Sequence, residues 1–172
     1  MSVKNILTEP NVLLRQVSKP VVKVGDVERA LMNDMLDTMY AAPGIGLAAI
    51  QIGIPKRIIV MDISGNENKK EPRYFVNPVI KNKNKEKAKY EEGCLSVPDQ
   101  FAEIERPNTC EVEYLDYEGK KQLLKADGLL ATCIQHEMDH LEGILFIDYL
   151  SKLKKSMIIK KLSKIKINRA IL

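Results

Sequence analysis

The sequence predicts an α+β fold: a small mixed, mainly antiparallel β-structure around a central metal-binding helix, with a further helix at the C-terminal end. Three observations carry this prediction. Apolar residues recur at helical spacing near the start, in residues 127–141 and after residue 151. Strand-like segments fill the region between the first two helices, and a His-Glu-x-x-His pattern lies within the second.

Length and composition are those of one globular domain, which we expect to cover residues 1–172. The 172 residues are 45% hydrophobic and 29% charged, and no apolar run approaches the roughly 20 residues that a membrane span requires. The first ten residues lack the apolar core of a secretory signal, and three cysteines provide no disulfide framework. A reducing, cytoplasmic setting is therefore expected.

The first predicted helix covers residues 26–42 and follows an irregular opening segment. Asp26 is the expected N-cap, and Pro43 with Gly44 ends the helix. The apolar residues of its buried face lie four apart: Val27, Leu31, Met35 and Met39. A glycine-rich loop is expected over residues 44–53.

Strand-like segments come next, and they differ in how much of each is buried. The candidates are residues 57–63, rich in Ile and Val; residues 74–80, weakened by Pro78; the alternating residues 109–117; and residues 122–125 after a turn. The lysine-rich residues 81–89 are expected to form a solvated loop or hairpin. Residues 91–93 are expected to form a turn before Cys94.

A second helix, from the Asp127 cap to residue 141 and stopped by Gly143, carries the pattern with the most specific chemistry. His136 and His140 lie on one helix face, so both imidazoles can reach a single metal ion. Glu137 lies beside them and can handle a proton. The spacing therefore predicts a hydrolytic metal site, which usually has three protein ligands.

The third ligand is not fixed by spacing. A metallopeptidase with this motif would take its third ligand from a residue after His140. No histidine follows His140, and Glu142 and Asp148 are the only acids that do. Cys133 shares the histidine face but lies about 7.5 Å along the helix axis from the midpoint of the two histidines, too far for its short side chain. Cys94 lies in a stretch without clean periodicity and suits a thiolate ligand. The spacing alone therefore leaves two candidates for the third ligand, Cys94 or a downstream acid.

Three segments together resemble the signature motifs of bacterial peptide deformylases, and they occur in the same order. They are residues 44–51 (GIGLAAIQ), residues 92–96 (EGCLS) and residues 135–143 (QHEMDHLEG). Residues 6–21 and 126–130 are also similar to that family, so the resemblance covers nearly the whole chain. It implies a metal-dependent hydrolase that removes the N-formyl group from the N-terminal methionine of newly made polypeptides. It also implies iron(II) as the ion, with zinc, nickel or cobalt able to occupy the site.

The resemblance assigns roles to individual residues. Cys94, His136 and His140 are expected to hold the metal, and Glu137 is expected to act as general acid and base. The Gln51 side-chain amide and the Leu95 backbone N–H are expected to stabilise the oxyanion.

A methionine-sized apolar pocket is expected beside the metal. Leu129 and Cys133 extend the histidine-bearing stripe of the helix in an apolar direction, and the resemblance places Ile45 and Glu92 near the pocket walls. Gly46, like Gly44, would allow close approach of an extended peptide. Phe101 departs from the family because many relatives have there an arginine that contacts the substrate backbone, and Arg106 is a candidate replacement.

Positive charge is concentrated at the C-terminal end of the chain, in residues 151–172. Residues 151–172 hold eight of the 27 basic residues and no acid, although the net charge is only +4. A basic amphipathic helix is predicted at about 151–168, with this apolar stripe: Leu153, Met157, Ile158, Leu162 and Ile165. One interpretation is a helix that packs on the acidic body; the other, suggested by related deformylases, is docking on ribosomal RNA. We expect a monomer without a membrane role, and a non-catalytic ribosome-binding protein remains an alternative function.

Overall fold

The structure is a computed structural model that describes residues 2–65 and 68–171, with side chains described as far as residue 166. Its helices are α1 (Asp26–Ala41), α2 (Gly128–Leu141) and α3 (Lys152–Ile171). Its strands are β1 (Gly46–Ala48), β2 (Ile58–Met61), β3 (Arg73–Lys83), β4 (Lys87–Cys94), β5 (Val97–Pro107), β6 (Thr109–Leu115) and β7 (Lys121–Asp127). Three short 3-10 turns complete it: η1 (Val12–Arg15), η2 (Ala49–Ile52) and η3 (Phe146–Tyr149). The predicted α+β class and the C-terminal helix are confirmed.

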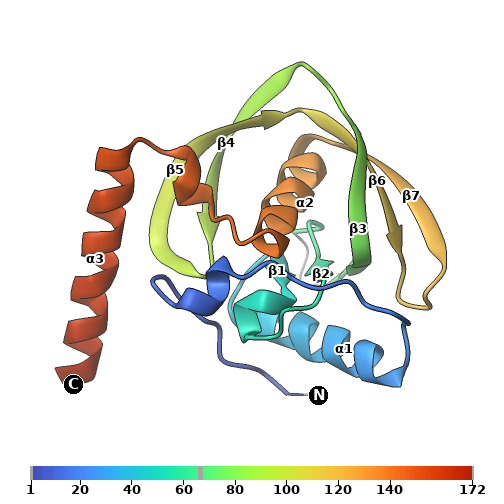
Figure 1. Ribbon diagram of the computed structural model, residues 1–172, viewed down its shortest axis with the longest axis horizontal. Helices are drawn as coiled ribbons and strands as arrows, with labels where there is room; N and C mark the ends of the chain where they lie inside the picture. The colour runs from blue at the N-terminus through green and yellow to red at the C-terminus, as the bar shows by residue number, and fades with distance from the viewer. Residues whose placement is uncertain (1, 66–67, 172) are drawn as a thin grey trace.

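The strands form two sheets around α2 (Figure 1). One has five strands in the order β1-β2-β3-β6-β7, and the other pairs β4 with β5. All pairings between these strands are antiparallel, and the described residues add one parallel bridge between Lys19 and Lys56. Helix α1 lies beneath β1 and β2, and α3 stands at the far side next to β5 (Figure 1).

Helix α1 has the predicted buried face but a different cap. Met32, Met35 and Met39 are fully buried against the sheet. The N-cap is Gly25, whose N–H donates to the Glu28 carboxylate at 3.1 Å, so the expected cap Asp26 is instead the first helical residue. A glycine cap costs little because the carboxylate three residues later satisfies the free N–H.

Two segments expected to be loops contain strands. The glycine-rich residues 44–53 hold β1 and η2, and residues 91–93 belong to β4 rather than to a turn. Strand β5 was not predicted at all. The pairing of Gly93 with Phe101 is followed by that of Cys94 with Val97, and this shift in register hides where β5 begins, although residues 102–106 alternate. The lysine-rich residues 81–89 divide between the ends of β3 and β4, which pair with different partners.

Pro78 weakens β3 less than expected because it lies in an irregularity of the strand. The register with β6 shifts between Val76 and Val79, where Asn77 takes a left-handed backbone conformation. The Asn77 side chain bonds both the N–H and the C=O of Val21, at 2.7 and 2.8 Å. The opening segment is thereby attached to the sheet at its bulge.

Helix α3 is predicted correctly, but only part of its apolar stripe is buried. Ile158 and Leu162 pack with Val97 and Ile104 of β5 in a cluster that also contains η3. Leu153 and Met157 are 72% and 52% exposed. Leu153 and Ile158 lie about 140° apart around a helix of 3.6 residues per turn, so one contact face cannot cover both.

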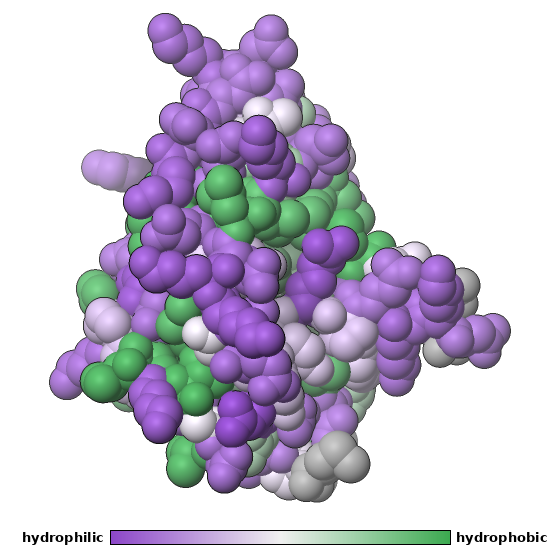
Figure 2. Space-filling view, turned by 90° about the vertical axis from the view of Figure 1, so that its right-hand side faces the viewer, coloured by the Kyte–Doolittle hydropathy of each residue, from purple (hydrophilic) through white to green (hydrophobic). Residues whose placement is uncertain are grey.

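No helix in the described part of the chain is long and apolar enough to cross a membrane. Seen from the side of β6 and β7, the surface is largely hydrophilic with separate apolar patches (Figure 2). Exposed Val79 and Leu123 lie in one row across this sheet, on either side of Glu113. Charged neighbours thus interrupt the apolar surface of this face.

Candidate active site

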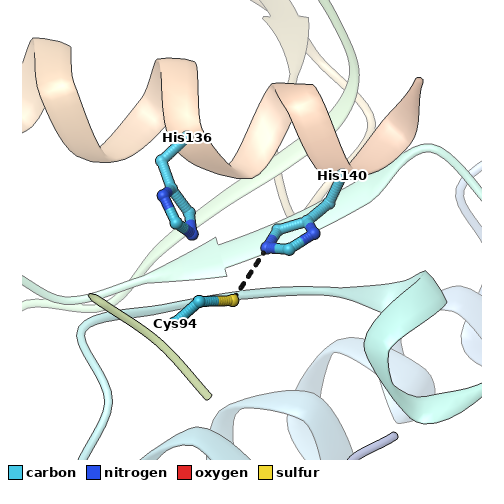
Figure 3. A group of neighbouring side chains, drawn as sticks. All are labelled: Cys94, His136 and His140. Atoms are coloured by element: carbon cyan, nitrogen blue, oxygen red, sulfur yellow. Dashed lines mark hydrogen bonds between the residues drawn. The ribbon is translucent and has the colours of Figure 1, made fainter. Parts of the chain in front are cut away.

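The side chains of Cys94, His136 and His140 point toward one another (Figure 3). Their potential ligand atoms all lie within 4.8 Å of one another, and Cys94 Sγ is 3.3 Å from His140 Nε2. Both histidines project from α2, four residues apart on one face, while Cys94 ends β4. The sequence-predicted ligand set is therefore assembled from two elements that are distant in the chain.

The donors of this cluster fit a divalent transition metal. One thiol and two imidazoles are typical ligands of zinc and of related metal ions. Glu92 Oε1 lies 2.8 Å from His136 Nδ1, so the Nε2 atom of that ring faces the cluster. A carboxylate that orients a ligating histidine in this way is a recurrent feature of protein metal sites.

The electrostatics of the two rings also suit a cation. Burial lowers the pKa of His140 well below its usual value, which keeps its ring neutral and able to ligate. Burial would also lower the pKa of His136, but hydrogen bonds with Cys94 and Glu92 outweigh it and raise that pKa. The Glu92 carboxylate that helps to raise this pKa would equally favour a metal cation.

Glu137 lies next to the cluster with a free carboxylate oxygen. Its side chain is 4% exposed, and its Oε2 has no hydrogen-bond partner among the described residues. Burial raises the pKa of Glu137 to about 7. A buried carboxyl with that pKa can both accept and return a proton near neutral pH.

Gln51 is held with its amide nitrogen toward Cys94. Its Oε1 accepts a hydrogen bond from the Ala48 N–H at 2.8 Å, and its Nε2 donates to Ser96 Oγ at 3.0 Å. The same Nε2 lies 3.6 Å from Cys94 Sγ. Because Gln51 is only 1% exposed, this network fixes the direction of the amide.

A cavity of about 440 Å³ opens beside the cluster and brings the other predicted residues together. Its lining includes Ile45, Gly46, Gln51, Glu92, Cys94, Leu95, Leu129, Cys133, His136 and Glu137. His140 is fully buried and does not line it. Ile45 and Leu129 are nearly half exposed, so the cavity offers apolar surface next to the candidate metal ligands.

Arg106 does not line the cavity, contrary to the suggestion that it replaces a substrate-contacting arginine. It is 5% exposed and donates to both carboxylate oxygens of Glu92 and to Asp139 Oδ2, at 2.7 to 3.0 Å. Burial would raise the pKa of Glu92, but the bonds from His136 and Arg106 outweigh it and lower that pKa. Arg106 therefore supports the carboxylate that orients His136.

This role of Arg106 is not predicted from the sequence, and neither are the contacts of Asp139 and Ser96 with the site. Ala102, Ile104 and Arg106 alternate with exposed residues along β5, so a two-residue period would have placed Arg106 on the inner face. Glu142 and Asp148, the acids considered as alternative ligands, instead pair with Arg57 and with Arg15 and Lys155. Neither belongs to the cluster, so the metallopeptidase alternative is not favoured.

Comparison with known proteins identifies the family. Residues 3–156 match the family described as polypeptide deformylase. The chain belongs to this family. It is similar to the peptide deformylases of Pelagibacter ubique (strain HTCC1062), 88% identical over 99% of both chains, and of Phenylobacterium zucineum (strain HLK1), 59% identical over 95% of this chain and 97% of the relative.

Solved structures that match this chain support the same assignment to the family. The peptide deformylase of Ehrlichia chaffeensis in complex with actinonin is 47% identical, with a TM-score of 0.90 over 95% of this chain and 98% of that one. The peptide deformylase of Legionella pneumophila is 43% identical, with a TM-score of 0.92 over 98% of both chains. The resemblance found in the three sequence motifs is confirmed at the level of family and fold.

Proposed function

We propose that this chain is a peptide deformylase that acts in protein biosynthesis: a metal-dependent hydrolase that removes the N-formyl group from the N-terminal methionine of nascent polypeptides and releases formate. The observation that carries this proposal is the cluster of Cys94, His136 and His140 next to the free carboxylate of Glu137, at the wall of an apolar cavity. Family membership supports the same activity.

Cys94, His136 and His140 are the proposed metal ligands, and iron(II) is the proposed ion, with zinc, nickel or cobalt as substitutes. When bound, the ion supplies a Lewis acid that lowers the pKa of water and polarises a carbonyl oxygen. The convergence of the three side chains, and the Glu92 carboxylate that orients His136, support this assignment.

Glu137 is the proposed general base and acid. Its free Oε2 takes a proton from water as the water oxygen adds to the formyl carbon. It then gives that proton to the peptide nitrogen as the C–N bond breaks, which leaves formate and a free amino terminus. Burial and the raised pKa of Glu137 support both transfers.

The Gln51 Nε2 and the Leu95 backbone N–H are proposed to stabilise the oxygen that becomes negative during this addition. The fixed direction of the Gln51 amide, beside Cys94 Sγ, supports its role. Ile45, Gly46, Glu92, Leu129 and Cys133 are proposed as walls of the substrate pocket, since all five line the cavity. An apolar methionine side chain suits the exposed Ile45 and Leu129.

We also propose that residues 1–172 form one catalytic domain, that the enzyme is a cytoplasmic monomer, and that α3 docks on the ribosome. Support for the docking comes from the exposed lysines of α3, a helix that contains no acid: Lys152, Lys154, Lys160, Lys161, Lys164 and Lys166. Ribosomal RNA would attract these lysines through its phosphates.

The activity is tested by release of formate from formyl-Met peptides. The protein is purified without oxygen, because a thiolate–iron(II) site is open to oxidation, and its metal is measured before the assay. We expect stoichiometric metal and formate release that a chelator abolishes. Cleavage of internal peptide bonds instead, or no turnover with metal present, would contradict the proposal.

A further inference from the structure

The imidazole ring of His136 has aromatic contacts as well as its hydrogen bond to Glu92. The ring of Phe146 stacks on it, with centroids 6.2 Å apart and planes 27° from parallel, and His140 meets it edge-on at 5.1 Å. The bond from Nδ1 to Glu92 sets the direction of Nε2 but leaves the ring free to rotate about that direction. A stacked neighbour opposes this rotation, so Phe146 fixes the plane in which His136 presents Nε2.

Phe146 is itself held by the packing between α3 and β5. It is the first residue of η3, is 1% exposed, and belongs to the apolar cluster that contains Val97, Ile158 and Leu162. A side chain enclosed at this density has no space for another rotamer. The ring that faces His136 is therefore supported from its other side by residues that do not belong to the site.

Tyr149, at the other end of η3, reaches the same histidine through a chain of hydrogen bonds. Its hydroxyl donates to Asp139 Oδ2 at 2.8 Å, and Arg106 donates to the same oxygen at 2.8 Å. The Arg106 guanidinium also lies over the Tyr149 ring, 5.0 Å from its centroid, within the range of a cation–π contact. Because Arg106 donates to both carboxylate oxygens of Glu92, Tyr149 is connected to the group that orients His136.

The position of η3 is fixed by contacts outside the proposed metal site. Asp148 Oδ2 accepts a hydrogen bond from the Leu145 N–H at 3.0 Å and so closes the turn. Arg15 and Lys155 pair with the same carboxylate. Neither cation is among the described residues that line the cavity or form the ligand cluster. The turn thus has its own anchors and can act as a support for the histidine.

We propose that η3 is a positioning element for the metal ligand His136, in which Phe146 fixes the plane of the imidazole and Tyr149 holds Asp139 and Arg106 in the arrangement that orients Glu92. The inference rests on the proposed function, because it assumes that His136 binds an ion. Neither Phe146 nor Tyr149 is among the residues that line the cavity. Both therefore act through other residues, and they affect how firmly the ion is held rather than how a peptide binds.

The two contributions differ in size. Removing an outer partner of a metal ligand typically costs about 10- to 100-fold in metal affinity or activity. Phe146 contacts the ligand itself, so Phe146→Leu should speed metal release by about tenfold, the lower end of that range. Tyr149 is 52% exposed and acts through three further side chains. Tyr149→Phe should therefore speed release by about threefold, near the lower limit of what one hydrogen bond contributes.

The experiment measures how fast nickel(II) passes from the loaded protein to an excess of chelator, together with the absorption spectrum of the cobalt(II) form. Urea unfolding of the metal-free protein records stability separately. Phe75→Leu is the control for Phe146→Leu, because it removes another fully buried ring. Tyr40→Phe is the control for Tyr149→Phe, because it removes a hydroxyl that donates to Asp62 at 2.6 Å. Neither control residue is among those that line the cavity or form the cluster.

We expect faster nickel release and shifted cobalt bands in Phe146→Leu and Tyr149→Phe, with KM for formyl-Met peptides unchanged. The two controls should keep the wild-type release rate and spectrum even where they lower stability. A second comparison tests the route from Tyr149. In an Asp139→Ala background the hydroxyl has lost its partner, so Tyr149→Phe should have no further effect on release.

Three results would overturn the inference: wild-type release from either η3 variant, equal acceleration in its control, or the full effect of Tyr149→Phe in the Asp139→Ala background. The first would deny any influence on the ion, the second would reduce the effect to general stability, and the third would remove the hydrogen-bonded route. Failure of the proposed function is distinct, because the wild type would then bind no nickel or release no formate.

Discussion

Gly46 and Glu137 occupy adjoining space that has no room for a further methyl group. A Cβ on Gly46 would lie 2.4 Å from Glu137 Oε1, closer than atoms approach in proteins. Gly46 begins β1 and Glu137 lies in α2, so this contact sets the separation of strand and helix at the proposed site. The glycine expected to accommodate a peptide thus also accommodates the proposed base.

Gly46→Ala should displace the Glu137 carboxylate and lower kcat by about 100-fold, the usual cost of misplacing a reacting group by about 1 Å. Metal content should stay stoichiometric, because the clash involves neither Cys94 nor the two histidines. Gly25→Ala is the control, since its Cβ would meet only Glu28 Oε2 at an ordinary 3.6 Å. Wild-type kcat in Gly46→Ala would show that the carboxylate relocates without loss.

Glu137→Gln should lower kcat by about 10²- to 10⁴-fold while leaving the metal bound. The amide keeps the size of the side chain but cannot accept the proton from water. Steady-state formate release and metal analysis of the same sample separate the two effects. Glu142→Gln, which removes a surface carboxylate paired with Arg57, should retain activity. A loss below about tenfold in Glu137→Gln would argue against the assigned role.

The parts of the site that lie on a regular element were predictable. The spacing of His136 and His140 translates directly into a shared face of α2, and the apolar period of residues 127–141 revealed that helix. The family motifs supplied Cys94. Geometry then placed its sulfur 3.3 Å from His140 Nε2, a long-range relationship that no local pattern contains.

The parts that were not predictable depend on pairing between distant strands. The ribbon of β4 and β5 is largely exposed, and its register shifts between Gly93 and Cys94, so the start of β5 is hidden in the sequence although residues 102–106 alternate. The inward direction of Arg106, and its bonds to Glu92 and Asp139, follow from that pairing. The apolar stripe of α3 was visible, but which half of it is buried depends on where β5 lies.

Cys94→Ala should release the metal, because it removes one of three proposed protein ligands. In the cobalt-substituted protein the thiolate absorption should disappear, and metal analysis after dialysis should fall well below one ion per chain. Cys133→Ala is the control: Cys133 lines the cavity but does not belong to the ligand cluster. Unchanged cobalt absorption in Cys94→Ala would mean that another residue supplies the third ligand.

Asp62→Asn should destabilise the fold in a pH-dependent way, away from the proposed site. Burial alone would raise the pKa of Asp62. Hydrogen bonds from Tyr40, Ser64 and Glu71 outweigh the effect of burial and lower this pKa to about 2. An acid whose pKa is lowered on folding stabilises the protein above its unfolded pKa of about 3.9, and that contribution is lost as the pH falls toward 2.

The loss of stability in Asp62→Asn should therefore be about 1.5–3 kcal/mol at pH 7, the range of hydrogen bonds to a charged group, and should shrink between pH 4 and pH 2. Urea unfolding at several pH values measures it. Asp26→Asn, at an exposed carboxylate that pairs with Arg29 across one helical turn, should show a smaller loss. A constant difference across this pH range would contradict the assignment of charge to Asp62.

The proposed docking of α3 on the ribosome is best tested by changing the charge of the helix, not by removing the helix. Truncation at residue 150 would uncover Val97 and Ile104, which Ile158 and Leu162 bury, so lost binding could follow from lost structure. Replacing Lys160, Lys161 and Lys164 with glutamine leaves that contact intact because all three side chains are exposed.

This triple variant should unfold at the wild-type temperature and deformylate short peptides normally, yet co-sediment more weakly with ribosomes at low salt. Each phosphate contact contributes about 0.7 to 0.9 to the slope of log affinity against log salt, so the slope should become shallower by about 2 to 3. Glutamine at Lys81, Lys83 and Lys85 makes the same change of charge on the β-structure, where all three lysines are also exposed, and should leave co-sedimentation unchanged. If both variants lose binding equally, the attraction belongs to the net charge of the protein; if neither does, α3 contributes only its packing against β5.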